Sequence, residues 1–178
     1  QSEALRFYDL IVAYIDAFQN GSKEARLENH IYYFINRLDV SSFGKNFTEK
    51  ELEMIYTIIL YDHPELYVTD GLRYEVDSNK NIKSVIGICK KDYVKADVRN
   101  KLQQEIDKNV QRYLDEVSGL KTDIEKEIAI HNKMLEEVTY AEKTDIQAAS
   151  AHNIMSVLDD DKTTMPVCEG YTKAFQLL

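Results

Sequence analysis

The 178-residue chain has no tryptophan, only two cysteines and no long apolar run. Two cysteines, Cys89 and Cys168, are too few for a disulfide framework, so we interpret both as free thiols. No run approaches the roughly eighteen apolar residues of a membrane-spanning helix, so no membrane span is expected. Basic residues are scarce, 22 against 31 acidic ones, and the net charge at pH 7 is −9. Without a basic face to neutralise phosphates, neither nucleic acid nor an anionic membrane is expected as a partner.

Residue patterns that would bind a metal ion or a cofactor are missing as well. The four histidines and two cysteines are scattered without the pairs that a metal site requires, and there is no glycine-rich phosphate loop. The acidic run 159–161 resembles a calcium loop only in composition, because the glycine and glutamate of such a loop are absent. We interpret the run as a solvated turn and expect neither a metal ion nor a cofactor.

Hydrophobic residues make up 44% of the chain, which is enough for a packed core. Their spacing at three- and four-residue steps, together with the capping boxes Thr48/Glu51 and Thr122/Glu125, predicts mainly helices. These are expected at about 3–19, 23–38, 48–63, 93–118, 123–137 and 145–157, with a last helix that begins at Cys168.

One segment has the period of strands. Leu66–Val76 and Ile82–Cys89 alternate in polarity around the polar turn 77–81, which predicts an antiparallel hairpin at about 66–89. Cys89 is then a small buried apolar residue. The fold class is therefore mainly α with a small antiparallel β-hairpin (α+β). A helical N-terminal region is expected over 1–119, and a second domain over 120–178.

The sequence at the end of the chain predicts a turn, followed by a helix that begins at a cysteine. Pro166 ends the turn, and an apolar face follows at three- and four-residue steps. Cys168 is thus expected in the first turn of a buried helix. Unpaired N–H groups and the positive end of the helix dipole favour the thiolate there.

These residues resemble a known family. Val167-Cys168-Glu169-Gly170-Tyr171, followed by Ala174-Phe175, is similar to the nucleophile motif of bacterial transglutaminase-like proteins. The resemblance continues upstream through Ile130-His131-Asn132, Val138-Thr139-Tyr140 and Ser150-Ala151-His152. Thr172 departs from the alanine of the family, and 159–165 lacks its glycine.

The resemblance implies a papain-type site in which Cys168 is the catalytic nucleophile. It implies a thioester formed from a protein or peptide substrate, resolved by water (protease or amidase) or by an amine (cross-linking). The His and Asp of the family lie downstream of the cysteine, so 120–178 is interpreted as the start of a truncated domain. An extracellular or cell-surface location is also implied, although residues 1–20 show no signal peptide. The alternative is a non-enzymatic surface or protein-interaction module.

Three other residues of this stretch are interpreted as follows. His131 lies on the apolar side of its helix with Ile124, Ile128 and Leu135, and is expected to be a hydrogen-bonded core residue. His152 is expected to pack near the helix junction rather than to act as a base. Tyr140 either borders the cleft or anchors its loop. The truncated C-terminal helix is expected to mediate self-association through exposed apolar residues.

Overall fold

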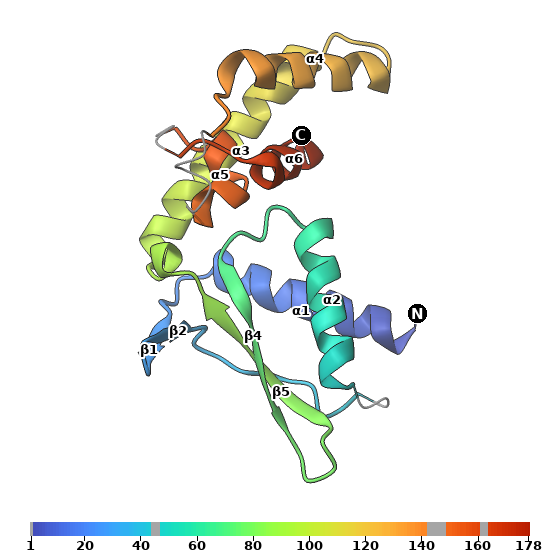
Figure 1. Ribbon diagram of the computed structural model, residues 1–178, viewed down its shortest axis with the longest axis vertical. Helices are drawn as coiled ribbons and strands as arrows, with labels where there is room; N and C mark the ends of the chain where they lie inside the picture. The colour runs from blue at the N-terminus through green and yellow to red at the C-terminus, as the bar shows by residue number, and fades with distance from the viewer. Residues whose placement is uncertain (1, 44–46, 142–148, 161–163) are drawn as a thin grey trace. The chain divides into compact units, whose positions relative to one another are not determined.

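The computed structural model describes residues 2–43, 47–141, 149–160 and 164–178 (Figure 1). The chain divides into two units, Gln1–Asn100 and Lys101–Leu178. Of the described residues, 54% are helical and 15% lie in an antiparallel sheet, so the predicted α+β class is confirmed. The units divide inside helix α3 (Ala96–Val117), whereas the sequence suggested a boundary near residue 119. None of the described helices combines the length and the apolar composition that crossing a membrane requires.

Two predicted helices of the first unit are confirmed. Helix α1 (Glu3–Gln19) begins at Ser2, whose side chain accepts a hydrogen bond from the backbone N–H of Leu5. Helix α2 (Glu49–Asp62) begins with the predicted reciprocal capping box of Thr48 and Glu51. The two helices cross each other beside the long hairpin of the sheet (Figure 1).

That hairpin is also confirmed, but it does not stand alone. Strands β4 (Thr69–Val76) and β5 (Ile82–Cys89) pair along their whole length. The other edge of β5 pairs with β2 (Ile31–Tyr33) and then with β3 (Leu38–Asp39), both antiparallel. With β1 on β2, the sheet has five strands. The expectation of a single hairpin was therefore wrong.

The prediction of a helix at 23–38 was also wrong, because this segment forms strands of the same sheet. Strand β1 (Arg26–Glu28) pairs with β2 around a tight turn in which Asn29 and His30 have φ values of 49° and 64°. Such left-handed residues interrupt a helix and suit a two-residue hairpin. The run Ile31–Phe34 is β-branched and aromatic, which favours a strand, and Phe34 donates its N–H to the carbonyl of Gly87 in β5.

The first unit contains a buried arginine that links several of its segments. The side chain of Arg99 is fully buried, and its guanidinium lies 4.4 Å from the ring centre of Phe18. It donates hydrogen bonds of 2.5–3.1 Å to five backbone carbonyls. These carbonyls belong to Gln19, Gly21, Lys23, Tyr93 and Val94. The residues after α1 are thereby fixed to the first turn of α3.

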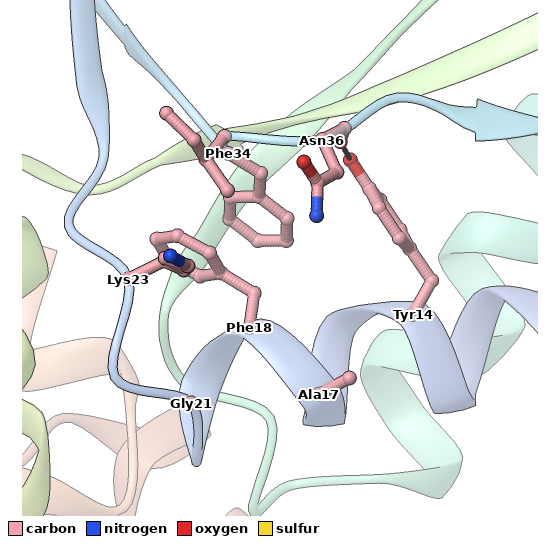
Figure 2. A pocket seen from close by; sticks show the side chains of 8 residues that line it. Tyr14, Ala17, Phe18, Gly21, Lys23, Phe34 and Asn36 are labelled. Atoms are coloured by element: carbon pink, nitrogen blue, oxygen red, sulfur yellow. Dashed lines mark hydrogen bonds between the residues drawn. The ribbon is translucent and has the colours of Figure 1, made fainter.

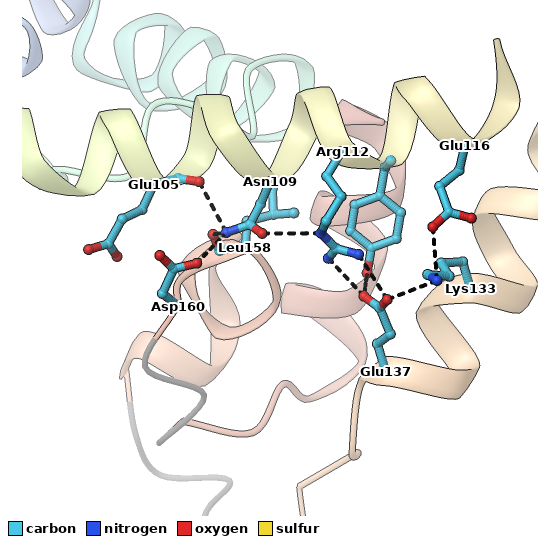
Figure 3. A network of polar contacts seen from close by, with 9 residues as sticks. Glu105, Asn109, Arg112, Glu116, Lys133, Glu137, Leu158 and Asp160 are labelled. Atoms are coloured by element: carbon cyan, nitrogen blue, oxygen red, sulfur yellow. Dashed lines mark hydrogen bonds and ion pairs between the residues drawn. The ribbon is translucent and has the colours of Figure 1, made fainter.

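The second unit is built on α3 and on α4 (Asp123–Glu137), which begins with the predicted capping box. Figure 3 shows side chains of α3 pointing toward α4 and α5. Arg112 donates two hydrogen bonds of 2.8 Å to Glu137, and Tyr113 donates a third. Burial alone would raise the pKa of Glu137, but Arg112 and Lys133 lower it to about 2.

After α4 the chain returns to α3. The predicted helix at 145–157 falls partly on 142–148, which lie outside the described residues. Its described part is a 3₁₀-helix, η2 (Ala149–His152), and the single turn α5 (Met155–Leu158), so a continuous helix is not formed there. Asn109 holds the end of α5 by donating to Leu158 O and Asp160 Oδ1, and Lys108 pairs with Asp160 at 2.6 Å. Asp160 is thus anchored rather than freely solvated, and Asp161 lies outside the described residues.

Candidate functional site

Helix α6 (Cys168–Leu177) presents the predicted cysteine as its first residue. Ala174 of the expected apolar face is buried, as is Gly170, whereas Tyr171, Phe175 and Leu178 are half-buried and Cys168 itself is exposed. The residue before it, Val167, provides no side-chain cap for the first turn. Cys168 therefore combines an accessible thiol with a helix terminus that offers backbone N–H groups and a favourable dipole.

Two backbone hydrogen bonds fix the approach to Cys168. Val167 donates its N–H to Ala151 O at 3.1 Å, and Ala141 donates to Pro166 O at 2.9 Å. The buried side chains of Ala141, Ala151 and Val167 form one small apolar cluster around these bonds. The motif segments at Ala151 and Val167 are thus joined in space with Ala141, which directly follows the motif segment 138–140, although residues 141 and 167 lie 26 positions apart in the sequence.

Gly170 is the point of closest packing. A Cβ atom at this position would lie 2.6 Å from Ser156 Oγ and 3.0 Å from Asn153 O, and closer still to Ala151 O. Two of these three neighbours are backbone oxygens, which have little room to move. Only glycine lets the first turn of α6 lie this near the η2–α5 segment, so Gly170 sets the position of Cys168.

Tyr140 contacts the cysteine directly. Its hydroxyl lies close enough to the side chain and backbone of Cys168 for the two residues to influence each other electrostatically. Desolvation first, and then the neighbouring side chain of Cys168, raise the pKa of Tyr140. The side chain remains 55% exposed. Of the two interpretations of Tyr140, the structure favours the one in which it borders the cysteine.

Glu169, next to the cysteine, is held by a lysine and a histidine. Lys173 donates to Glu169 Oε1 at 2.8 Å, and His152 Nδ1 lies 3.0 Å from Glu169 Oε2. Burial alone would raise the pKa of Glu169, but Lys173 and then His152 lower it overall. Its carboxylate charge is therefore balanced locally instead of opposing a thiolate at Cys168. The packing of His152 at the helix junction agrees with the sequence interpretation.

The prediction for His131 was wrong. The residue is exposed, and its ring stands edge-on to Phe175 with the centres 6.1 Å apart. The buried residues of α4 are Ile130 and Met134, on a different face. Phe175, Leu177 and Leu178 at the end of α6 are half-buried, and self-association through them stays a prediction.

The first unit contains a separate cavity of about 110 Å³ (Figure 2). The rings of Phe18 and Phe34 form part of its wall, and the side chain of Asn36 points between Phe34 and Tyr14. The Tyr14 hydroxyl is already engaged, because it donates to Asn36 O and accepts from Gly87 N. The Tyr14 hydroxyl is therefore not available to a ligand, and Lys23 is the charged residue that lines the cavity. Within the described residues, no three histidine, cysteine, aspartate or glutamate side chains converge as a metal site would require.

Sequence reasoning missed two features of the Cys168 site. The Glu169–Lys173 pair could have been found from its four-residue spacing in a helix. The contact of Tyr140 with Cys168 could not, because it depends on how the chain returns between them. Comparisons with known protein families, curated proteins and solved structures find no significant match.

Proposed function

We propose that the chain carries the nucleophile of a transglutaminase-like cysteine enzyme that acts on peptide or side-chain carboxamide bonds. The observation that carries the proposal is the exposed Cys168 at the start of α6, with Tyr140 beside it. Sequence motif and geometry support the proposal separately, since the upstream segments of the motif pack around the cysteine. An extracellular or cell-surface location belongs to the same proposal.

The chemistry begins at the sulfur. Cys168 Sγ forms a bond to the carbonyl carbon, and the carbonyl oxygen takes up the negative charge. The C–N bond then breaks, the amine leaves with a proton, and a thioester remains on Cys168. Water resolves the thioester to an acid, whereas a second amine resolves it to a new amide.

The developing oxyanion needs hydrogen-bond donors. The backbone N–H of Cys168 is one such donor, and the Tyr140 side chain lies near it. A substrate oxygen placed there would accept this N–H, and the Tyr140 hydroxyl would donate its own proton to it. We assign His152 a positioning role, because its Nδ1 is directed to Glu169. In the family that the sequence resembles, another histidine accepts the thiol proton.

Thiol acylation tests this proposal. The chain is treated with p-nitrophenyl acetate and the acyl group is located by mass spectrometry. We expect a thioester at Cys168 and at least roughly tenfold less at the buried Cys89, because the latter is inaccessible. Cys168→Ser should abolish the thioester, and without the histidine of the family no peptide turnover is expected. Equal acylation of both cysteines would contradict the proposal.

The second candidate is a non-enzymatic interaction module. The exposed apolar residues of α4 favour it, because a surface of this kind suits a protein partner. Partner binding without any acylation of Cys168 would select this candidate.

A further inference from the structure

Helix α4 has two apolar faces, and only one of them is packed. Ile130 and Met134 point into the second unit and are 6% and 0% exposed. The outer stripe of α4 consists of Ile124, Ile128, His131 and Leu135. Its aliphatic members are 69%, 56% and 60% exposed in sequence order, and His131 is exposed too.

The spacing of the outer stripe is 4-3-4, the pattern of a coiled-coil seam. At this spacing the four side chains lie in one band along about three turns of the helix. Single exposed apolar residues are ordinary, but a continuous band of large ones on one helix marks a contact surface. A band of this length and width suits another amphipathic helix, which would contribute its own residues at three- and four-residue steps.

The charges beside the stripe indicate which helix would fit. Both lysines of α4 are used within the unit, Lys126 with Asp123 at 3.7 Å and Lys133 with Glu116 and Glu137 at 2.9 and 3.2 Å. The charge left over on this surface is therefore negative.

Glu127 and Glu136 supply that negative charge. Both are exposed, Glu127 directly before Ile128 and Glu136 directly after Leu135, and within the described part of the chain neither has an ion pair. A second copy of the chain would bring the same carboxylates to the seam, and like charges at flanking positions oppose pairing. The repulsion argues against a homodimer on this surface.

We propose that the outer stripe of α4 binds a basic amphipathic helix of a partner protein. The aliphatic residues of the partner bury Ile124, Ile128 and Leu135, and its lysines or arginines pair with Glu127 and Glu136. His131 is the polar member of the seam, and its contact with Phe175 fixes its place. A polar position within an apolar seam sets the register of the two helices. The interaction is independent of chemistry at Cys168.

The test measures binding of a designed helical peptide by fluorescence anisotropy. Its seam positions are leucine and its flanking positions lysine, and a second peptide carries glutamate at the flanks. The lysine peptide should bind and should weaken as salt screens the pairs. Ile128→Asp should weaken binding at least about tenfold, because one buried isoleucine is worth more than that factor.

Two further variants locate the site and test its charge. Ile58→Asp on α2, where the isoleucine is 43% exposed, is the matched control and should leave binding unchanged. The double variant Glu127→Lys with Glu136→Lys should lose the lysine peptide and gain the glutamate peptide. All substituted positions are exposed, and circular dichroism checks that each variant is folded.

Four results would overturn the proposal. Equal binding of both peptides would show that charge does not select the partner. Loss of binding in Ile58→Asp but not in Ile128→Asp would move the surface to α2. A dimer that Ile128→Asp converts to a monomer in size-exclusion chromatography would make a second copy the occupant. Failure of the lysine peptide to bind the unaltered chain would also refute it.

Discussion

The two units place their polar groups in opposite ways. In the first unit Arg99, Gln19 and Cys89 are buried and engaged, and burial raises the pKa of the Cys89 thiol to about 11. In the second unit Cys168 and Tyr140 are both exposed and lie beside each other at the surface. A buried polar group must be satisfied by the fold and serves stability, whereas an exposed one remains available to a ligand.

Both units contain close contacts with backbone atoms, but these contacts have different roles. In the first unit Arg99 joins carbonyls that would otherwise lack donors after α1. In the second unit Gly170 brings α6 against η2 and so positions a thiol. The comparison predicts that substitutions in the first unit mainly change stability, and that substitutions around α6 also change reactivity.

The largest expected effect is that of Arg99→Met. The variant removes every donor of the guanidinium and leaves buried carbonyls unpaired, so the free energy of unfolding should fall by about 3–5 kcal/mol. Urea denaturation followed by circular dichroism measures the change. Arg73→Met, at an exposed arginine of β4, should cost less than about 1 kcal/mol. A similar loss in both variants would contradict the role assigned to Arg99.

Gly170→Ala should have the next largest effect. The added methyl group would collide with Ala151 O and Ser156 Oγ, and overpacking of this kind costs about 1–3 kcal/mol. Because α6 must shift, the rate of Cys168 alkylation should change as well. Gly119→Ala is the matched control, since no atom lies within 4 Å of the added Cβ. If both substitutions are tolerated equally, α6 is not held by the contact at Gly170.

The sequence predicted helix ends better than helix faces. The capping boxes at Thr48 and Thr122 each mark the start of a helix, because the signal is local. Two stripes with 4-3-4 spacing were misinterpreted. In the segment 23–38, the apolar residues from Leu27 to Leu38 have the spacing of a helix but belong to strands. Pairing with β5 and the turn at Asn29 outweighed this helical periodicity. The stripe on α4 is helical but uncovered, because spacing shows that a face is apolar and not that anything packs on it.

The sequence likewise predicted only part of the site. Cys168 at the start of a helix followed from local pattern, and the structure places it there. Tyr140 and His152 reach α6 only through the path of the chain, which spacing does not encode. Their partners could therefore be found only from the structure.

Glu137→Gln tests the surface network of the second unit. The residue joins Arg112, Tyr113 and Lys133, so the free energy of unfolding should fall by about 1–2 kcal/mol at pH 7 after allowance for solvent screening. The pKa of Glu137 is about 2 in the fold against an ordinary 4.5. Its contribution is therefore complete above about pH 4.5 and is lost as the pH falls through about 2.

The same denaturation series, run at several pH values, checks the sign. The difference between Glu137→Gln and the unaltered chain should shrink as the pH is lowered through this window. Glu136→Gln is the control, because Glu136 is exposed on the same helix with no ion pair among the described residues. A difference that grows on acidification would show that the carboxylate of Glu137 is not stabilised by its cations.

The smallest expected effect concerns reactivity, at Tyr140. Desolvation, and then the neighbouring Cys168, raise the pKa of Tyr140, so the phenol keeps its proton and is available to donate it to a thiolate at Cys168. Tyr140→Phe removes this donor while the ring stays. A net hydrogen bond is worth about 0.5–1.5 kcal/mol, and this one is near the surface, so alkylation of Cys168 by iodoacetamide should slow about threefold. Cys89 is the internal standard, and Tyr61→Phe on the exposed surface of α2 should leave both rates unchanged. Faster alkylation in Tyr140→Phe would mean that the hydroxyl shields the thiol. The polar groups of the two units would then differ only in how exposed they are.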